Sequence, residues 1–217
     1  MESKVKTALT VEQIRARLAA ERPARDPRER LRASVDGPVS PALEAVLERP
    51  GRAASVLLAL LARPDGLAVL LTERAAHLKD HAGQVSLPGG RVAEGETAAA
   101  AAMREAHEEV GLAPAAVDVL GSLDALLTGT GFAVTPVVGF ITDAAFAPTP
   151  DPREVARVFE LPLAHVLHER SITVEYFERH GARLRTYELR HGGFRIWGAT
   201  AAILHDFREV ILDEGAT

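Results

Sequence analysis

The stretch GRVAEGETAAAAAMREAHEEVGL, from Gly90 to Leu112, decides the fold. It is rich in alanine from Thr97 to Val110 and ends at Gly111, which predicts a helix with a glycine at its carboxyl-terminal cap. At about 100° per residue, three glutamates share an arc of about 100° on this helix: Glu105, Glu108 and Glu109. A separate stripe that suits packing on a sheet is formed by Ala99, Met103, Ala106 and Val110. The sequence therefore predicts a helix with one core face and one acidic face.

The acidic face needs positive charge from elsewhere. No lysine stands at helical spacing from the three glutamates, and Arg104 lies only at the edge of their arc. Hard divalent cations take oxygen ligands, and Mg²⁺ is typically held by one or two carboxylates together with substrate phosphates. A solvated charged face is the ordinary alternative for acidic residues on a helix. The preceding Leu-Pro-Gly-Gly favours a metal site, because glycines let a backbone approach a ligand closely.

The segments on either side of this helix predict strands. Two apolar runs, ASVLLALLA and LAVLLTER, are separated by Arg-Pro-Asp-Gly and predict a hairpin. Further strand-like runs lie between 117 and 142 and between 155 and 197, and Pro136 favours an edge position or a bulge. A closing helix is predicted at 198–211. This order favours an α/β fold in which helices enclose a mixed sheet.

Composition places the chain of 217 residues among ordinary globular proteins, with 47% hydrophobic and 25% charged residues. Disordered and fibrous classes are excluded. Cysteine is absent, so disulfides, thiolate metal ligands and a cysteine nucleophile are excluded, and we expect a cytoplasmic location. The net charge of -5 gives no general attraction to nucleic acid, and no apolar run reaches the roughly 18 residues of a membrane-spanning helix. We expect a small-molecule partner, and neither nucleic acid nor a membrane.

A change of composition near residue 51 predicts two parts, a helical extension at 1–50 and a main domain at 51–217. Thr10 is placed to cap a helix, which Pro23 and Pro27 then interrupt. The arginines of the extension alternate with acidic residues. We therefore expect them to form a solvated face of mixed charge without a chemical role.

The segment from Gly90 to Leu112 resembles the Nudix box: a glycine, five residues, a glutamate, seven residues, then Arg-Glu-apolar-x-Glu-Glu-x-Gly-apolar. Every fixed position is filled, by Gly90, Glu96, Arg104, Glu105, Ala106, Glu108, Glu109, Gly111 and Leu112. The resemblance implies an α/β/α sandwich around a mixed β-sheet, with the catalytic helix following a glycine-rich loop. It also implies hydrolysis of a nucleoside diphosphate joined to another moiety, with Mg²⁺ or Mn²⁺.

The resemblance implies a role for each matching residue. The metal ligands would be Glu105, Glu108, Glu109 and the carbonyl of Gly90. Arg104 would orient a helix glutamate through an ion pair, and Glu96 would support the site from the start of the helix. The water-activating base would be a glutamate of the box or one from a later loop, for which Glu154 is our candidate. An acidic residue near a helix N-terminus is the alternative interpretation of Glu154.

The loop before the box resembles the motif of the coenzyme A pyrophosphatase branch of this family, Leu-Leu-Thr-x-Arg, a spaced arginine and glycine, then Phe-Pro-Gly-Gly. The matching residues are Leu70, Leu71, Thr72, Arg74, Gly83, Pro88, Gly89 and Gly90. Lys79 stands where arginine is usual and keeps its charge without the bidentate fork. Leu87 stands where phenylalanine is usual, and the distal RIWGATAAIL also resembles this branch.

This second resemblance implies hydrolysis of coenzyme A and its thioesters to adenosine 3′,5′-bisphosphate and 4′-phosphopantetheine or its acyl form. The substrate would be bound by Arg74, Lys79, His81 and Gly89. The alternative substrates are ADP-ribose, NADH or another nucleoside diphosphate derivative. A Nudix-fold sensor that binds without cleaving is the alternative class, which the intact glutamates disfavour. A zinc pair of His77 and His81 lacks an evident third ligand, and Trp197 is expected to pack rather than to stack on adenine.

Overall fold

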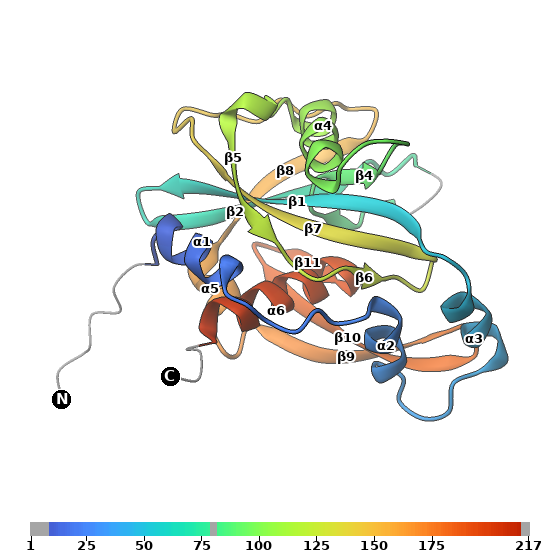
Figure 1. Ribbon diagram of the computed structural model, residues 1–217. Helices are drawn as coiled ribbons and strands as arrows, with labels where there is room; N and C mark the ends of the chain where they lie inside the picture. Colours follow the sequence, from blue (N-terminus) through green and yellow to red (C-terminus); the bar gives the residue numbers. More distant parts are fainter. Residues whose placement is uncertain (1–8, 79–81, 214–217) are drawn as a thin grey trace, which may run out of the picture.

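The computed structural model describes residues 9–78 and 82–213, and its centre is an eight-stranded sheet (Figure 1). Its strands are β1 (Arg52–Arg63), β2 (Gly66–Arg74), β3 (Val85–Ser86), β4 (Gly89–Arg91), β5 (Val117–Ser122), β6 (Leu126–Leu127), β7 (Phe132–Ile141) and β8 (Val155–Pro162). The order along the sheet is β3-β2-β1-β7-β5, with β4 on β1, β6 on β7 and β8 on β2. The sheet is mixed, because β1 pairs parallel with β7 and antiparallel with β2 and β4.

Two helices cover the two faces of this sheet. Helix α4 (Ala98–Val110) lies above it in Figure 1, and α6 (Gly198–Leu212) lies below it. The first strand is apolar on both sides, as a strand buried between two layers must be. Leu57 and Leu61 pack in the cluster that includes α4, whereas Leu58 and Leu60 pack in the cluster that includes α6. The predicted α/β/α sandwich around a mixed sheet is confirmed.

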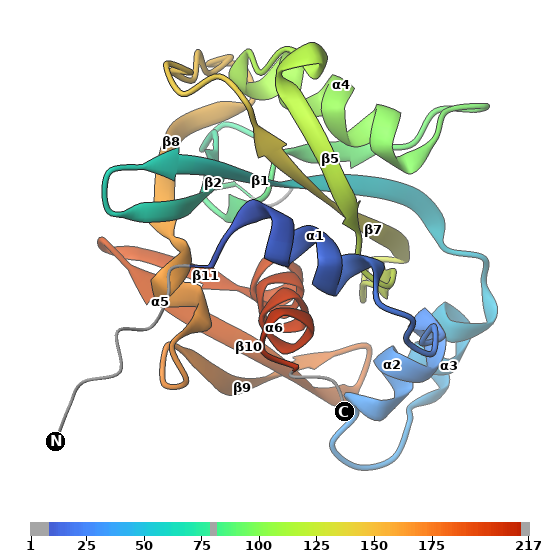
Figure 2. The same ribbon diagram turned by 60° about the vertical axis from the view of Figure 1, so that its left-hand side comes forward.

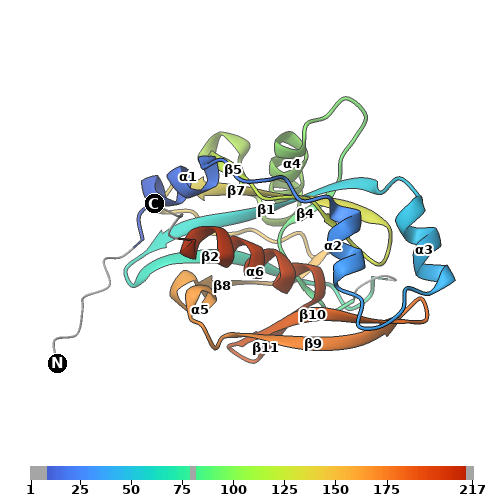
Figure 3. The ribbon, with the colours of Figure 1, turned by 60° about the horizontal axis from the view of Figure 1, so that its bottom comes forward.

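A separate three-stranded sheet lies on the far side of α6, as Figures 1 and 3 show. It consists of β9 (Ile172–Arg179), β10 (Ala182–His191) and β11 (Phe194–Trp197) in antiparallel order. A short helix, α5 (Leu163–Leu167), and a 3₁₀ turn at Pro114–Ala116 complete the domain. The sequence predicted these strands but not their separation from the central sheet, because strand periodicity does not specify a partner.

The helix and hairpin signals of the sequence are confirmed. Helix α4 begins after Thr97, whose side chain accepts a hydrogen bond from the Ala100 N–H at 3.1 Å. It ends at Gly111, which adopts φ 72° in the left-handed region that favours glycine. The hairpin of β1 and β2 turns between Arg63 and Gly66. No helix among the described residues is long and apolar enough to cross a membrane.

Pro136 lies inside the sheet rather than at its edge. Its strand, β7, runs between β1 and β5 and pairs with β1 from Arg52 to Leu60. The expected edge position is therefore wrong. On the other side, β5 ends at Ser122 and β6 begins only at Leu126, so the ladder is interrupted opposite Pro136. A residue without an N–H is tolerated where the neighbouring strand provides no ladder partner.

Three helices precede the first strand: α1 (Val11–Ala19), α2 (Pro27–Ala33) and α3 (Pro41–Glu48). Thr10 forms the capping box of α1 with Gln13. Pro27 does not simply interrupt a helix, because it is the first residue of α2 behind an Asp26 cap. Pro41 begins α3 behind a Ser40 cap in the same way. Asp-Pro and Ser-Pro pairs were therefore start signals, since proline at the first helical position loses no hydrogen bond.

The N-terminal helices pack against the domain. Figure 2 shows α1 beside β5 and α6, and its Ile14 is fully buried in the same core as the central sheet. The arginines of this region are not merely a solvated face. Arg30 pairs with the buried Asp206 of α6, and Arg25 donates to Asp124 at 3.1 Å. Their role in this structure is to attach the extension.

Truncation of Ile14 should measure how much the packing of α1 contributes to the stability of the protein. Ile14→Ala is expected to lower the free energy of unfolding by about 2–5 kcal/mol, because it leaves a cavity in the core. Urea denaturation gives the value. Glu12→Gln, on an exposed position of the same helix, is the control and should change stability by less than about 0.5 kcal/mol. A loss for Ile14→Ala as small as that of the control would contradict the packing described above.

Candidate active site

The site begins with two glycines of β4 that lie directly against α4. A Cβ at Gly89 would collide with the Ser55 carbonyl oxygen and with Val56 of β1. A Cβ at Gly90 would overlap the carboxylate of Glu105. Only glycine allows strand and helix to approach so closely, so the Leu-Pro-Gly-Gly loop determines where the helix carboxylates lie.

Glu109 is the most deeply buried of the acidic residues on α4, with 3% of its surface exposed. Its carboxylate accepts a hydrogen bond from the Gly89 backbone, while its Oε2 is buried without a partner among the described residues. The pKa of Glu109 is raised to about 8, mainly by burial and also by the charges of Glu154 and Glu105, against the opposing effect of Arg74. A buried carboxylate with an unsatisfied oxygen is a group that a cation would stabilise.

Arg104 connects the start of the helix to its acidic face. Its Nε and Nη2 donate to the two carboxylate oxygens of Glu96 at 3.0 and 3.1 Å, which is a bidentate pair. Its Nη1 donates to Glu105 at 2.8 Å and to Glu108 at 3.4 Å, and Nη2 also donates to the Arg91 carbonyl. These contacts raise the pKa of Arg104 and lower that of Glu96. The ion pairs expected from the box are present.

The three glutamates of the predicted acidic face differ in their exposure. Glu109 is buried and Glu105 lies against Gly90, so only Glu108 is largely exposed, at 55% of its side chain. From its position at the edge of the arc, Arg104 reaches both Glu105 and Glu108. A wheel places residues around one helix but does not show that β4 covers part of the arc.

The donor chemistry of the site suits a hard divalent cation. Carboxylate oxygens and the carbonyl of Gly90 are the ligand types that Mg²⁺ and Mn²⁺ take, and the unpartnered Glu109 Oε2 offers an open position. Within residues 9–78 and 82–213, no three acidic or histidine side chains already converge at ligand spacing. Arg104 accounts for part of this, because it holds Glu105 in an ion pair. The roles of these residues as metal ligands stay a prediction.

Two residues distant in sequence complete the surroundings of Glu109. Arg74 ends β2, and its Nε is buried without a hydrogen-bond partner among the described residues. Glu154 stands in the turn before β8 rather than at a helix N-terminus, and its carbonyl accepts from the Ala75 N–H at 2.8 Å. This bond brings the turn beside Arg74. Both side chains act on the charge of Glu109, so the structure brings the candidate base to the box helix.

A cleft of about 440 Å³ opens beside the two glycines. Its near wall is formed by β1, β3 and β4, and its far wall by the loop at 128–130, by β9 and by the start of α6. Arg74, Arg91 and Arg179 line it together with three aromatic side chains, those of Phe132, Phe177 and Trp197. Trp197 also packs edge-on to Phe177, with ring centroids 6.3 Å apart, so its predicted packing role is present although it faces the cleft.

Of the four residues predicted to bind substrate, two line the cleft and two lie outside the described part of the chain. Gly89 and Arg74 line the cleft, whereas Lys79 and His81 lie outside the described residues. His77 donates from Nε2 to the Arg153 carbonyl at 3.1 Å. The sequence analysis did not identify the residues of the far wall, such as Arg179. No local sequence pattern marks a residue that comes to line this cleft only through the tertiary fold.

The NUDIX domain family model matches residues 51–178, which include the box and the loop before it. The chain belongs to the Nudix family. The matched segment begins where the N-terminal helices end, and it stops within β9. The helix α4 is therefore the Nudix helix, and Gly90 to Leu112 is its box.

Bacterial proteins are similar to this chain. The chain is 42% identical over 166 residues to the uncharacterized Nudix hydrolase NudL of Escherichia coli O7:K1, covering 76% of this chain and 83% of the relative. The NudL of Shigella flexneri is 42% identical over 168 residues, with 76% and 84% covered. Among solved structures, the Nudix hydrolase RenU from M. smegmatis is 28% identical with a TM-score of 0.46, over 53% of this chain and 73% of that one.

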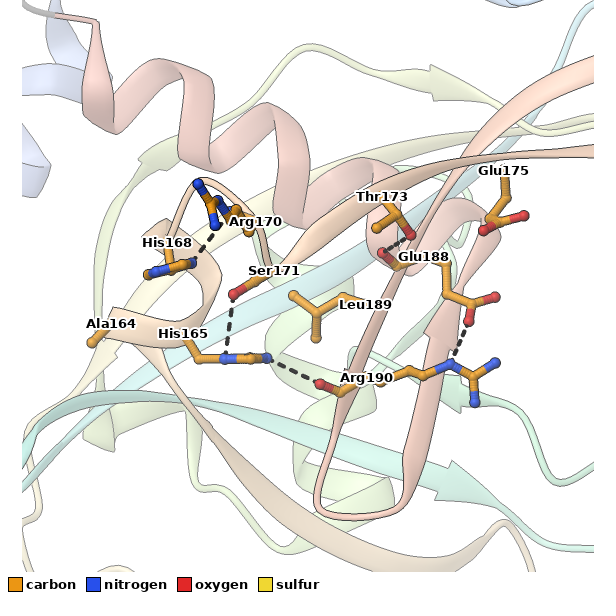
Figure 4. Close-up of a pocket in the computed structure, with 10 residues that line it drawn as sticks. All are labelled: Ala164, His165, His168, Arg170, Ser171, Thr173, Glu175, Glu188, Leu189 and Arg190. Carbon is orange, nitrogen blue, oxygen red and sulfur yellow. Dashed lines mark hydrogen bonds and ion pairs between the residues drawn. The ribbon is translucent and has the colours of Figure 1, made fainter.

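A second hollow, of about 860 Å³, lies between α5 and the three-stranded sheet (Figure 4). Its polar groups are engaged with one another. His165 donates from Nε2 to the Arg190 carbonyl at 3.0 Å, and its Nδ1 accepts from Ser171. Glu188 pairs with Arg190 at 2.7 Å and with Arg195 at 2.5 Å. These paired groups leave little free charge for a ligand, unlike the cleft beside the box.

The burial of Glu109 predicts a pH-dependent stability. Folding raises the pKa of Glu109 from 4.5 to about 8, so its contribution to stability is full below pH 4.5 and falls as the pH rises to about 8. Glu109→Gln removes the titrating carboxylate and with it this loss of stability at higher pH. In EDTA, we expect the Tm of the variant to exceed that of the wild type by a margin that grows from about pH 5 to about pH 8.

Thermal unfolding followed by circular dichroism measures this margin. Glu108→Gln is the matched control, because it removes a carboxylate at an exposed position of the same helix. Its effect on Tm should not grow over the same pH range. A margin for Glu109→Gln that stays constant with pH would show that Glu109 is not the buried titrating group described here.

Proposed function

We propose that this Nudix hydrolase cleaves the diphosphate of coenzyme A and its thioesters, using Mg²⁺ or Mn²⁺. The products are adenosine 3′,5′-bisphosphate and 4′-phosphopantetheine or its acyl form. Family membership and the intact box support hydrolysis of a pyrophosphate-containing substrate. One observation carries the finer proposal: residues of the upstream coenzyme A motif, Arg74, Gly89 and Gly90, lie in one cleft beside Glu109.

The metal would be held by Glu105, Glu108, Glu109 and the Gly90 carbonyl. When bound, a divalent ion neutralises diphosphate charge and makes the attacking water more acidic. Arg104 anchors Glu105 to the loop before the helix through Glu96, which keeps the first carboxylate oriented. Gly90 provides the room for that carboxylate. Glu105 is thus oriented before substrate arrives, which reduces the reorganisation that this residue needs for catalysis.

Two further side chains act on the substrate and on the water. The Arg74 guanidinium, with its buried and unpartnered Nε, would donate to a phosphate oxygen and offset charge that develops there. Glu154 is exposed beside the buried Glu109 and would accept the proton of the attacking water. The water attacks one phosphorus in line while the other phosphate leaves, and no covalent intermediate on the protein is required.

A substrate panel tests the proposed function. We expect purified protein with Mg²⁺ or Mn²⁺ to hydrolyse coenzyme A and its thioesters with a higher kcat/KM than ADP-ribose, NADH or nucleoside triphosphates. Chromatography of the products identifies the bond that is cleaved. Glu108→Gln should lower kcat at least about a hundredfold without unfolding the protein, because it removes a ligand charge and preserves shape. Preference for ADP-ribose or NADH would replace the coenzyme A assignment.

The role of Glu154 has its own test. Glu154→Gln should lower kcat by about 10²–10⁴-fold with little change in the metal concentration needed for half-maximal activity, because it removes a base and not a ligand. Glu169→Gln, at an exposed position next to α5, is the control and should keep wild-type kinetics. Full activity of Glu154→Gln would move the base to a glutamate of the box.

A further inference from the structure

The cleft beside the box contains cations that have no acidic partner. Arg91 and Arg179 line it, and in the described part of the chain neither forms an ion pair with an acidic residue. Most of the other arginines are ion-paired, as Arg63 is with Glu160. Among the described residues that line the cleft, none is acidic, although the whole chain carries a net charge of -5. This local excess of positive charge is suited to an anionic ligand.

The three arginines of the cleft come from different elements of the fold. Arg74 ends β2, and its charge acts on Glu109. Arg91 follows Gly90 on β4, and Arg179 comes from β9 in the opposite wall. One diphosphate next to the box does not require cations on the far wall. Arg179 belongs to the three-stranded sheet, whereas α4 lies on the other side of the central sheet (Figure 1). This placement indicates a ligand with a further anionic group besides the reacting phosphates.

Arg179 is oriented before any ligand binds. Its Nε donates to the Gly129 carbonyl at 3.2 Å, and a Cβ at Gly129 would lie 2.7 Å from Arg179 Cδ, so the side chain lies close over this backbone. His180 Nε2 donates to the same carbonyl at 2.6 Å. The terminal Nη groups of Arg179 have no partner among the described residues, and a fixed guanidinium presents them at a low entropic cost.

The aromatic side chains indicate which half of a substrate lies here. Phe132, Phe177 and Trp197 line the same cleft, so a flat base and a phosphate would find both of their partners together. An uncharged pantetheine arm would leave the arginines unpaired. We propose that Arg179 and Arg91 bind the 3′-phosphate of the adenosine half of the substrate and thereby determine specificity. This inference rests on the proposed function, whose substrate carries that phosphate.

Binding of the two nucleotide fragments, without metal or turnover, tests the inference. Calorimetry in EDTA compares adenosine 3′,5′-bisphosphate with AMP, which lacks only the 3′-phosphate. The wild type should bind the bisphosphate at least about tenfold more tightly, as a charged hydrogen bond allows. Arg179→Met keeps the aliphatic stem over Gly129 and should reduce this preference to about threefold or less. Arg91→Met should reduce it in the same direction.

Arg185→Met is the matched control, because Arg185 is exposed on the neighbouring strand β10 and does not line the cleft. It should keep the wild-type preference, which separates a specific contact from the loss of one positive charge. An equal preference in the wild type, Arg179→Met and Arg91→Met would overturn the inference. So would a wild type that binds both nucleotides equally.

Steady-state kinetics distinguish a failure of this inference from a failure of the proposed function. Arg179→Met should lower kcat/KM for coenzyme A by about ten- to a hundredfold and leave dephospho-coenzyme A nearly unchanged. An equal loss for both substrates would overturn the role of Arg179 and leave the coenzyme A assignment intact. A wild type that does not hydrolyse coenzyme A would instead overturn the proposed function, whatever its nucleotide preference.

Discussion

The site depends on the contact between a glycine backbone and two carboxylates. Gly89 and Gly90 bring β4 so close to α4 that a side chain at either position would collide with β1 or with Glu105. This approach also buries Glu109, whose carboxylate accepts from the Gly89 backbone. An ionisable group is placed in the interior, where its ionisation lowers stability, and functional sites commonly carry such a cost.

Two arginines offset the negative charge of different parts of this acidic helix. Arg104 pairs with Glu96, Glu105 and Glu108, and so fixes the exposed end of the cluster. Arg74 approaches Glu109 from the end of β2 without forming a hydrogen bond through its buried Nε. Arg104 is therefore engaged within the protein, whereas Arg74 keeps capacity for a ligand. The box helix and the end of β2 thus provide a structural cation and one that is available to substrate.

The N-terminal helices carry no Nudix motif, yet they support the far wall of the cleft. Ser40 caps α3 and also donates to the His180 carbonyl, and His180 in turn donates to Gly129. His180 has a φ of 51°, a left-handed conformation that is uncommon for a residue other than glycine. These contacts hold the loop that Arg179 packs against. The helical extension therefore contributes to the geometry of the cleft through packing.

The sequence by itself determined the elements whose signals are local. Thr97 and Gly111 delimit α4, the apolar runs and their turn specify the hairpin, and the spacing of the box identifies the family. The tertiary structure alone decided the burial of Glu109, the separate three-stranded sheet and the cleft that Arg179 shares with β4. Caps, periodicity and turns act over a few residues, so they can be recognised in one segment. Burial and the walls of a cleft arise from contacts between segments that are distant along the chain, which no local pattern encodes.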